Sequence, residues 1–303
     1  MTQEKPISFT IDHNTSIGSV TLAVSELENS SQFYQKIIGL NKLNRRHDSV
    51  DLGINGNILL RLESHPGSKQ HPRAPGLFHL AIRLPNRKEL GHWLKHLMES
   101  RYRLGGAGDH LVSEALYLND PEGNGIEIYY DRPKEKWEYD ENGIKMNTLA
   151  VDLQALREQA GDKPFTRLPP DTIIGHIHLQ VNDLNKAVEF YRNIMGFQLM
   201  ALWPGAGFLS AGGYHHHIGV NVWNSRGAQP PPGDSLGLVN YEIVQPNSKA
   251  MDNLLDHLAA RNQLVEKWDK KWQIQDPSQN KIILKISDAG IPAANPSGKQ
   301  SHG

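Results

Sequence analysis

The 303-residue chain contains no cysteine, which excludes a disulfide framework, a thiol nucleophile, an iron–sulfur cluster and a cysteine-based zinc site. An excess of charge of one sign is also missing, because 32 Lys and Arg balance 33 Asp and Glu to a formal net charge of −1. Without a basic run, the chain has no electrostatic footprint for nucleic acid or an anionic membrane. We therefore expect a small-molecule function with no nucleic-acid or membrane partner.

Long apolar stretches are absent as well, since no uninterrupted apolar run approaches the roughly 18 residues of a membrane-spanning helix. The N-terminal segment also lacks the basic and apolar regions of a signal peptide. Together these absences predict a cytoplasmic protein. Histidine, by contrast, is plentiful at 15 residues, so any metal must be bound by histidines and carboxylates.

The two halves of the chain repeat each other. Residues 17–40 align without a gap to 174–197 at an offset of 157, with identical pairs such as Phe33/Phe190 and Tyr34/Tyr191. Two further matches begin at Gly76 and Gly237, and at the Asp-Pro turns 120–124 and 276–280. The chain is therefore a duplicated unit of about 150 residues, the size of one domain.

Each half divides again into two similar modules. A segment of period-2 apolar alternation is followed by a segment of helical spacing and then by two or three further strand-like segments. This pattern predicts four βαβββ modules, at about 15–72, 75–132, 172–230 and 235–288. We expect a first repeat at 15–132 (modules 1 and 2), a polar linker at 133–171 with a short helix at 152–160, a second repeat at 172–288 (modules 3 and 4) and a disordered tail at 289–303.

Four such modules resemble the vicinal oxygen chelate superfamily, which includes glyoxalase I, fosfomycin-resistance proteins and type I extradiol dioxygenases. Residues 109–133, 175–184 and 208–219 are more narrowly similar to its bacterial catechol-2,3-dioxygenase group. The resemblance implies an α+β fold in which pairs of modules close into two cup-shaped mixed sheets. It also implies a divalent metal, held by residues of the first and last strands.

The resemblance further implies which residues bind the metal. The ligand positions on first strands are occupied by Ser19, His79, His176 and Asn240, and those on last strands by Glu127 in module 2 and Ile283 in module 4. The surviving ligands are His79, Glu127 and His176. Two imidazoles and one carboxylate leave three positions open on Fe(II), enough for both oxygens of a diol and one O₂.

This distribution of ligands constrains how the modules pair. If module 1 paired with 2 and module 3 with 4, neither cup would own three ligands. If module 2 pairs with 3, one cup is complete and the chain binds one metal ion, and we predict this arrangement. Pairing of modules from different chains of a homo-oligomer would also complete the ligand set, and the sequence does not distinguish pairing within one chain from pairing between chains.

His178 competes with His176, because alternate residues of a strand face the same side. In the resembling family the ligand directly follows a glycine, which favours His176 and leaves His178 as a substrate contact. His215, His216 and His217 are consecutive, so on a regular strand at most 215 and 217, or 216 alone, can face the cup.

The resemblance implies His216 as a proton relay beside O₂, although a surface cluster is the alternative. Tyr117 precedes Glu127 by ten residues, the spacing at which the resembling enzymes place a catalytic tyrosine that hydrogen-bonds substrate. A cross-strand aromatic pair is the alternative for Tyr117. His110 is expected at the mouth of the cup as a further substrate contact.

These implications predict an Fe(II)-dependent extradiol dioxygenase that acts on catechol or a related aromatic diol with O₂, with Mn(II) able to replace iron. A glyoxalase-type isomerase or lyase on Zn or Ni is the first alternative, but that chemistry uses a second carboxylate. A non-catalytic protein that binds a small ligand is the second. A full ligand set in one pair of modules, beside its loss in the other, argues against non-catalytic binding.

Overall fold

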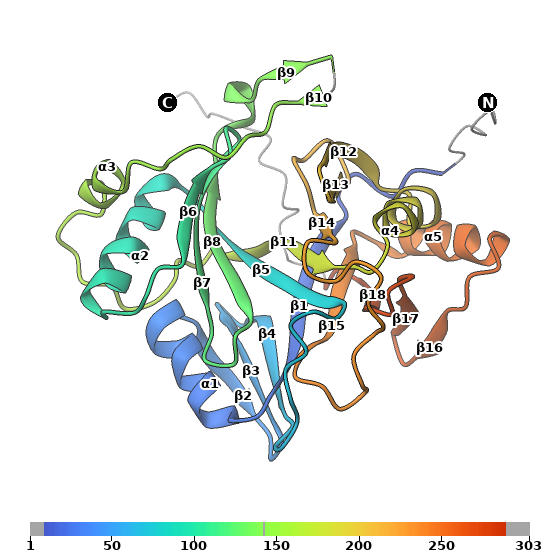
Figure 1. Ribbon diagram of the computed structural model, residues 1–303, viewed down its shortest axis with the longest axis horizontal. Helices are drawn as coiled ribbons and strands as arrows, with labels where there is room; N and C mark the ends of the chain where they lie inside the picture. The colour runs from blue at the N-terminus through green and yellow to red at the C-terminus, as the bar shows by residue number, and fades with distance from the viewer. Residues whose placement is uncertain (1–8, 142, 289–303) are drawn as a thin grey trace.

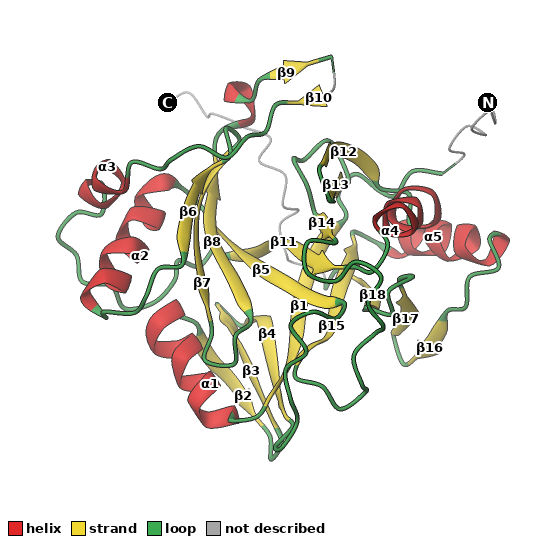
Figure 2. Ribbon diagram, viewed as in Figure 1, coloured by secondary structure: helices red, strands yellow, loops and turns green. Residues whose placement is uncertain are grey.

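The computed structural model describes residues 9–141 and 143–288, and shows two curled eight-stranded sheets with helices on their outer sides. In Figure 1, α1, α2 and α3 flank the sheets on one side, and α4 and α5 flank them on the other. Figure 2 shows the same arrangement of strands between helices. The predicted α+β fold of four βαβββ modules is confirmed.

Modules 1 and 2 account for the first half of the chain. Module 1 contains β1 (Ser16–Val24), α1 (Leu27–Phe33), a π-helical turn η1 (Tyr34–Ile38), β2 (Asn41–Arg45), β3 (Ser49–Ile54) and β4 (Asn57–Ser64). Module 2 contains β5 (Gly76–Leu84), α2 (Arg87–Glu99), β6 (Gly106–Asp109), β7 (Ser113–Asn119) and β8 (Gly125–Asp131).

Modules 3 and 4 repeat this order. Module 3 contains β11 (Ile173–Gln180), α4 (Leu184–Glu189), a π-helical turn η3 (Phe190–Ile194), β12 (Gln198–Trp203), β13 (Ala206–Ser210) and β14 (Ile218–Asn221). Module 4 contains β15 (Gly237–Gln245), α5 (Ser248–Ala260), β16 (Glu266–Trp268), β17 (Lys271–Gln275) and β18 (Lys281–Ile286).

The sheet order decides how the modules pair. One sheet runs β12-β13-β14-β11-β5-β8-β7-β6 and so joins modules 3 and 2, while the other runs β16-β17-β18-β15-β1-β4-β3-β2 and joins modules 4 and 1. The first strands of partner modules are antiparallel neighbours at the centre of each sheet. The predicted pairing of module 2 with module 3 is therefore confirmed, within a single chain.

The two longest helices, α2 and α5, each begin where a strand ends in a Pro-Asn pair. Asn86 accepts a hydrogen bond from the backbone N–H of Glu89 at 3.1 Å, and Asn247 accepts one from Ala250 at 2.9 Å. These are N-caps that satisfy a free N–H of the first helical turn. Each helix then buries an apolar stripe on its sheet, with Trp93 at the centre of the α2 stripe.

Two tyrosines bind consecutive modules to each other. Tyr34, which starts the π-helical turn of module 1, donates to buried Asp120 in the last turn of module 2 at 2.9 Å. Tyr191 donates to Asp276 at 3.0 Å in the same way between modules 3 and 4. Because modules 1 and 2 lie in different sheets, as do modules 3 and 4, these bonds join the two cups.

The linker lies against the cup formed by modules 2 and 3. It contains a single 3₁₀ turn η2 (Lys134–Lys136), the hairpin β9 (Tyr139–Asp140) and β10 (Gly143–Ile144), and α3 (Leu153–Glu158) within the predicted helix. Trp137 and Ile144 pack with Val112 and Tyr214 in a small second core. The repeat and linker boundaries remain a proposal, and the predicted disordered tail lies outside the described residues.

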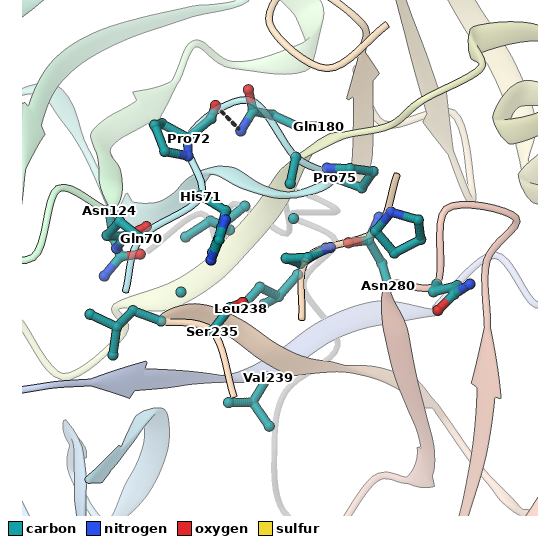
Figure 3. Close-up of a pocket in the computed structure, with 18 of the residues that line it drawn as sticks. Gln70, His71, Pro72, Pro75, Asn124, Gln180, Ser235, Leu238, Val239 and Asn280 are labelled. Carbon is teal, nitrogen blue, oxygen red and sulfur yellow. Dashed lines mark hydrogen bonds between the residues drawn. The ribbon is translucent and has the colours of Figure 1, made fainter. Parts of the chain in front are cut away.

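A cavity of about 390 Å³ lies where the connections between modules 1 and 2 and between modules 3 and 4 run side by side. Figure 3 shows His71 of one connection pointing toward Ser235 of the other and Leu238 of β15. Gln180 donates to the carbonyl of Pro72 at 3.4 Å across its edge. The cavity does not contain the predicted metal ligands.

None of the helices within residues 9–141 and 143–288 has the length and apolar character needed to cross a membrane.

Candidate metal centre

Three buried side chains converge at the centre of the cup formed by modules 2 and 3. His79 lies on β5, Glu127 on the adjacent parallel strand β8, and His176 on the adjacent antiparallel strand β11. Nε2 of His79 lies 2.9 Å, and Nε2 of His176 3.0 Å, from the same oxygen, Oε2 of Glu127. One ligand atom from each residue lies within 4.8 Å of the others. The three ligands predicted from sequence therefore meet in one chain.

The protonation states of Glu127 and His176 suit a divalent metal. Burial would raise the pKa of Glu127, but the two imidazoles hold it well below its usual value. Burial lowers the pKa of His176 to about 4. A charged carboxylate and neutral imidazoles are the forms that bind metal ions, and Nδ1 of His176 is buried without a hydrogen-bond partner among the described residues. Two nitrogen ligands and one oxygen ligand suit iron, manganese or zinc, and would leave coordination positions of the metal open for a bound small molecule.

The cluster lies at the base of a cavity of about 330 Å³. Its apolar wall consists of the residues Phe78, Val112, Met146, Trp203, Phe208 and Trp223. No lysine or arginine of the described chain lines it, and its one carboxylate is Glu127. A cavity of this size with aromatic walls suits a small planar ligand without a negative substituent.

His178 lines the same cavity but is not part of the three-residue cluster. It faces His79 across the strand pair, with ring centroids 4.9 Å apart. Burial, followed by the charges of His79 and His176, lowers the pKa of His178 well below its usual value. Nε2 of this neutral ring is buried without a partner in the described chain, so a ligand in the cavity could satisfy it.

Tyr117 and His110 form one wall of the cavity. The Tyr117 hydroxyl lies 2.7 Å from Nε2 of His110, and Nδ1 of His110 lies 3.0 Å from the carbonyl oxygen of Asn147 in the linker. The register partners of Tyr117 are Glu127 and Gly106, so it does not form the cross-strand aromatic pair considered as the alternative. Burial and then Glu127 raise the pKa of Tyr117 well above 10.

The consecutive histidines do not follow strand alternation, and that expectation was wrong. They lie in an irregular segment between β13 and β14, after Gly212 and Gly213 with positive φ, so alternate facing does not apply. His215 and His216 both line the cavity, and the His216 ring centroid lies 4.0 Å from that of His176. His217 turns toward the loop, where its Nδ1 lies 3.2 Å from the N–H of Ala211.

A second, partly buried acid, which the sequence analysis missed, lies behind these histidines. Oδ1 of Asp131 lies 2.8 Å from Nε2 of His215, and Oδ2 accepts from the Tyr214 hydroxyl at 2.8 Å and from Arg83 at 3.2 Å. Burial would raise the pKa of Asp131, but His215, Arg83 and Tyr214 hold it below its usual value. Asp131 follows Glu127 by four residues on one strand and so shares its face, which was the available signal.

The other cup has lost its carboxylate ligand position in module 1. The residue two positions after the ligand position of the first strand marks the place of the carboxylate. In module 2 this residue is Ala81, which pairs with Glu127, and in module 1 it is Thr21, which pairs with Arg61. Arg61 therefore stands where the cup of modules 2 and 3 has Glu127. It donates from Nε to buried Asp51 at 2.7 Å.

Module 4 has changed in a similar way. Asn240 and Ile283 stand where histidine and glutamate would be needed, and Glu242 accepts hydrogen bonds from the N–H of Ser19 at 3.1 Å and from Lys271 at 2.7 Å. Among the described residues, ion pairs occupy this cup, and no metal-binding group of three is found in it.

Comparisons with known proteins agree with this geometry. The family model described as the Glyoxalase/Bleomycin resistance protein/Dioxygenase superfamily matches residues 16–128 and 173–284. Catechol-2,3-dioxygenase of Bacillus subtilis (strain 168) is 44% identical over 279 residues, which cover 90% of this chain and 98% of that protein.

Solved structures share the fold. A putative dioxygenase from Bacillus subtilis subsp. subtilis str. 168 matches with a TM-score of 0.64 at 13% identity, over 93% of this chain and 88% of that one. Glyoxalase I from Zea mays matches with a TM-score of 0.53 at 13% identity, over 89% of this chain and 92% of that one. The extent of the family match and the 44% identity show that the chain belongs to the Glyoxalase/Bleomycin resistance protein/Dioxygenase superfamily.

Proposed function

We propose that the protein is an extradiol dioxygenase that binds Fe(II), with Mn(II) as the replacement ion, and uses O₂ to cleave the ring of catechol or a closely related diol. The convergence of His79, Glu127 and His176 beneath an aromatic cavity carries this proposal. The similarity to the catechol-2,3-dioxygenase of Bacillus subtilis supports the substrate class.

The bound metal would supply Lewis-acid chemistry, favouring ionisation of the diol and bringing it together with O₂ at the three positions that the protein leaves free. The aromatic walls hold the planar ring and exclude water. Nε2 of His178, which has no partner in the described chain, is available to a substrate oxygen. Tyr117, bonded to His110, lines the cavity, and its hydroxyl oxygen is proposed to accept a hydrogen bond from a diol hydroxyl.

His216 is the residue proposed to accept and return a proton during ring cleavage. Its ring lines the cavity and lies against the ring of His176, next to the positions proposed for diol and O₂. Burial, followed by the charges of nearby histidines, lowers its pKa well below 6.5, so the ring is a neutral base at physiological pH.

The cavity also indicates which diols should react. No lysine or arginine of the described chain lines it, so a carboxylate substituent would be buried without a counter-charge. We therefore propose a neutral diol as substrate. The alternative isomerase or lyase chemistry is disfavoured because Glu127 is the one carboxylate lining the cavity in the described residues.

The direct test is anaerobic loading with Fe(II), addition of catechol, and then admission of air. We expect a yellow ring-fission product and O₂ uptake in equal amounts. Mn(II)-loaded and Zn(II)-loaded protein serve as comparisons, with product expected for Mn(II) and not for Zn(II). Absence of product from a panel of neutral catechols with either Fe(II) or Mn(II) would sink the proposal.

Alanine substitution tests the ligand assignment separately. His79→Ala, Glu127→Ala and His176→Ala should each abolish metal binding and turnover, measured by metal analysis after desalting and by product formation. His216→Ala should keep its metal and lose roughly 10²- to 10⁴-fold in kcat, the range for a general acid–base residue. His47→Ala, at an exposed turn, is the matched histidine control and should change neither.

A further inference from the structure

Asp131 and His215 form a chain of short contacts that ends on His216. Nε2 of His215 lies 2.8 Å from Oδ1 of Asp131, and Nδ1 of His215 lies 2.8 Å from Nδ1 of His216. His215 is 1% exposed, so water does not compete for these contacts. Both nitrogens of the His215 ring are therefore committed, one to the carboxylate and one to His216.

We infer that Asp131, acting through His215, holds His216 in the tautomer with its proton on Nδ1 and leaves Nε2 unprotonated in the cavity. Asp131 and His215 are then positioning residues for the proton acceptor, and this inference rests on the proposed function of His216. It concerns the location of a proton on a neutral ring, and no change in charge is required.

The assignment follows from what each atom can donate. An ionised carboxylate only accepts hydrogen bonds, so the hydrogen between Asp131 and His215 must lie on Nε2 of His215. A neutral imidazole carries one hydrogen, so Nδ1 of His215 is a lone pair and accepts. The hydrogen between the two rings must then belong to Nδ1 of His216, and its Nε2 is the free lone pair.

The groups around Asp131 favour its ionised form, which the assignment requires. Arg83 lies 3.2 Å from Oδ2 of Asp131 and supplies a positive charge that compensates the carboxylate. The Tyr214 hydroxyl donates to the same oxygen at 2.8 Å, and the Tyr129 hydroxyl lies 2.8 Å from the Tyr214 hydroxyl. Trp137 of the linker packs against the His215 ring with centroids 5.6 Å apart, which fixes the ring plane.

The substitution Asp131→Asn would remove the negative charge of Asp131 and keep its shape. This change should reverse the donor and acceptor in both hydrogen bonds that lead through His215 to His216. In Asp131→Asn the side-chain amide can donate to Nε2 of His215, which moves the His215 hydrogen to Nδ1. His215 would then donate to Nδ1 of His216 and place the His216 hydrogen on Nε2. The proton acceptor would be lost while metal ligands and cavity walls stay in place.

The tautomer is measured directly by long-range ¹H–¹⁵N correlation of the histidine rings at pH 8, above the pKa of free imidazole at about 6.5. Spectra of metal-free and Zn(II)-loaded protein are compared, and His216→Ala assigns the signals. We expect the Nδ1–H pattern for His216 in the unaltered protein and the Nε2–H pattern in Asp131→Asn. An Nε2–H pattern in the unaltered protein would overturn the inference, whether or not the variant folds.

Kinetics provide the second test. Asp131→Asn should lower kcat for catechol roughly 10- to 100-fold, the usual effect of a group that orients a neighbouring functional residue, with KM changed little. The same substitution in a His216→Ala background should cause no further loss, because the two changes act on one function. An equal fold loss in both backgrounds would show a merely structural role and contradict the inference.

Asp51→Asn is the matched control, since it changes the same side chain in a buried ion pair of the other cup. It should alter neither the His216 signals nor kcat. Failure of the proposed function is distinguishable from failure of this inference: the first appears as no turnover in the unaltered protein, and the second as the wrong tautomer in the spectrum.

Discussion

At the scale of single residues, small side chains make room for the functional ones. Gly175 precedes His176, and a β-carbon at this position would overlap the hydroxyl of Tyr129. Tyr129 is fully buried and lies against His176 with ring centroids 4.9 Å apart. The glycine before the ligand therefore has a physical purpose: it lets Tyr129 pack beside the proposed metal ligand. Gly219 does the same for His178, whose ring lies 2.9 Å from the position of an added β-carbon.

We predict that Gly175→Ala displaces Tyr129 and His176, lowering the free energy of unfolding by about 1–3 kcal/mol through overpacking and weakening metal binding. Chemical denaturation and titration with Fe(II) measure the two effects. Gly106→Ala, where an added β-carbon meets nothing within 4 Å, is the control. Addition of Tyr129→Phe, which removes the overlapping hydroxyl, should restore part of the loss; a double variant no better than Gly175→Ala contradicts this account.

At the scale of elements, the pattern of the sequence was sufficient for most of the fold. Period-2 and helical spacing located the strands and helices, and the Pro-Asn pairs marked the starts of α2 and α5. The irregular segment of residues 211–217 was not located, because its histidines show no period that distinguishes it from a strand. The tyrosines shared by both halves proved to join modules through buried aspartates.

We predict that Tyr34→Phe lowers the free energy of unfolding by about 1.5–3 kcal/mol, because it removes a hydrogen bond to the buried carboxylate of Asp120. Tyr191→Phe should cost a similar amount through Asp276. Urea denaturation gives both values. Tyr102→Phe, which loses a more exposed bond to the carbonyl of Asn119, should cost clearly less, and an equal loss at all three positions would count against a special role for the aspartates.

At the scale of the whole molecule, one cup keeps the ligand set and the other uses ion pairs in its place. All three proposed ligands come from modules 2 and 3 of the same chain. The site is therefore complete without a partner subunit, whatever the oligomeric state. Buried charges of the second cup are paired, as Asp51 is with Arg46 and Arg61, and we expect these pairs to contribute to stability.

This arrangement predicts the outcome of a complementation experiment. Co-expressed His79→Ala and His176→Ala chains should show no recovery of turnover, because each chain lacks one ligand of its own site. The measurement is product formation from purified mixed protein, with a mixture of unaltered and His79→Ala chains as the positive control at half activity. Substantial recovery in the first mixture would mean that ligands are shared between chains.

The second cup predicts a dependence of stability on pH. Burial would raise the pKa of Asp51, but Arg61 and Arg46 hold it below 3.8. A lowered folded-state pKa means that the carboxylate stabilises the fold above pH 3.8 and that this contribution disappears as the pH falls through the folded-state pKa. Asp51→Asn should therefore destabilise the protein by about 1–3 kcal/mol at pH 7, and by progressively less below pH 4.

Urea denaturation of Asp51→Asn and of the unaltered protein at pH 7, 5, 4 and 3 checks this expectation. Product formation at pH 7 should be the same for both proteins, since Asp51 lies outside the cup that holds the proposed metal ligands. A stability difference that is constant from pH 7 to pH 3 would show that the charge of Asp51 is not the source of its contribution.

The sequence by itself determined the duplicated modules, and its resemblance to a known family implied the α+β fold and the grouping of His79, Glu127 and His176. The modules could be recognised because they depend on local periodicity, which a chain displays before it folds. The distribution of ligands also favoured the pairing of module 2 with module 3, although it left pairing across a homo-oligomer open.

Only the tertiary structure decided the rest. It placed the pairing within one chain, brought His215 and His216 together on the cavity wall, and set Asp131 behind them. It also assembled the aromatic wall from strands and loops of two modules. Contacts such as that of Asp131 with His215 join residues 84 positions apart, and the packing of sheets and loops, not any local pattern, determines which such residues meet.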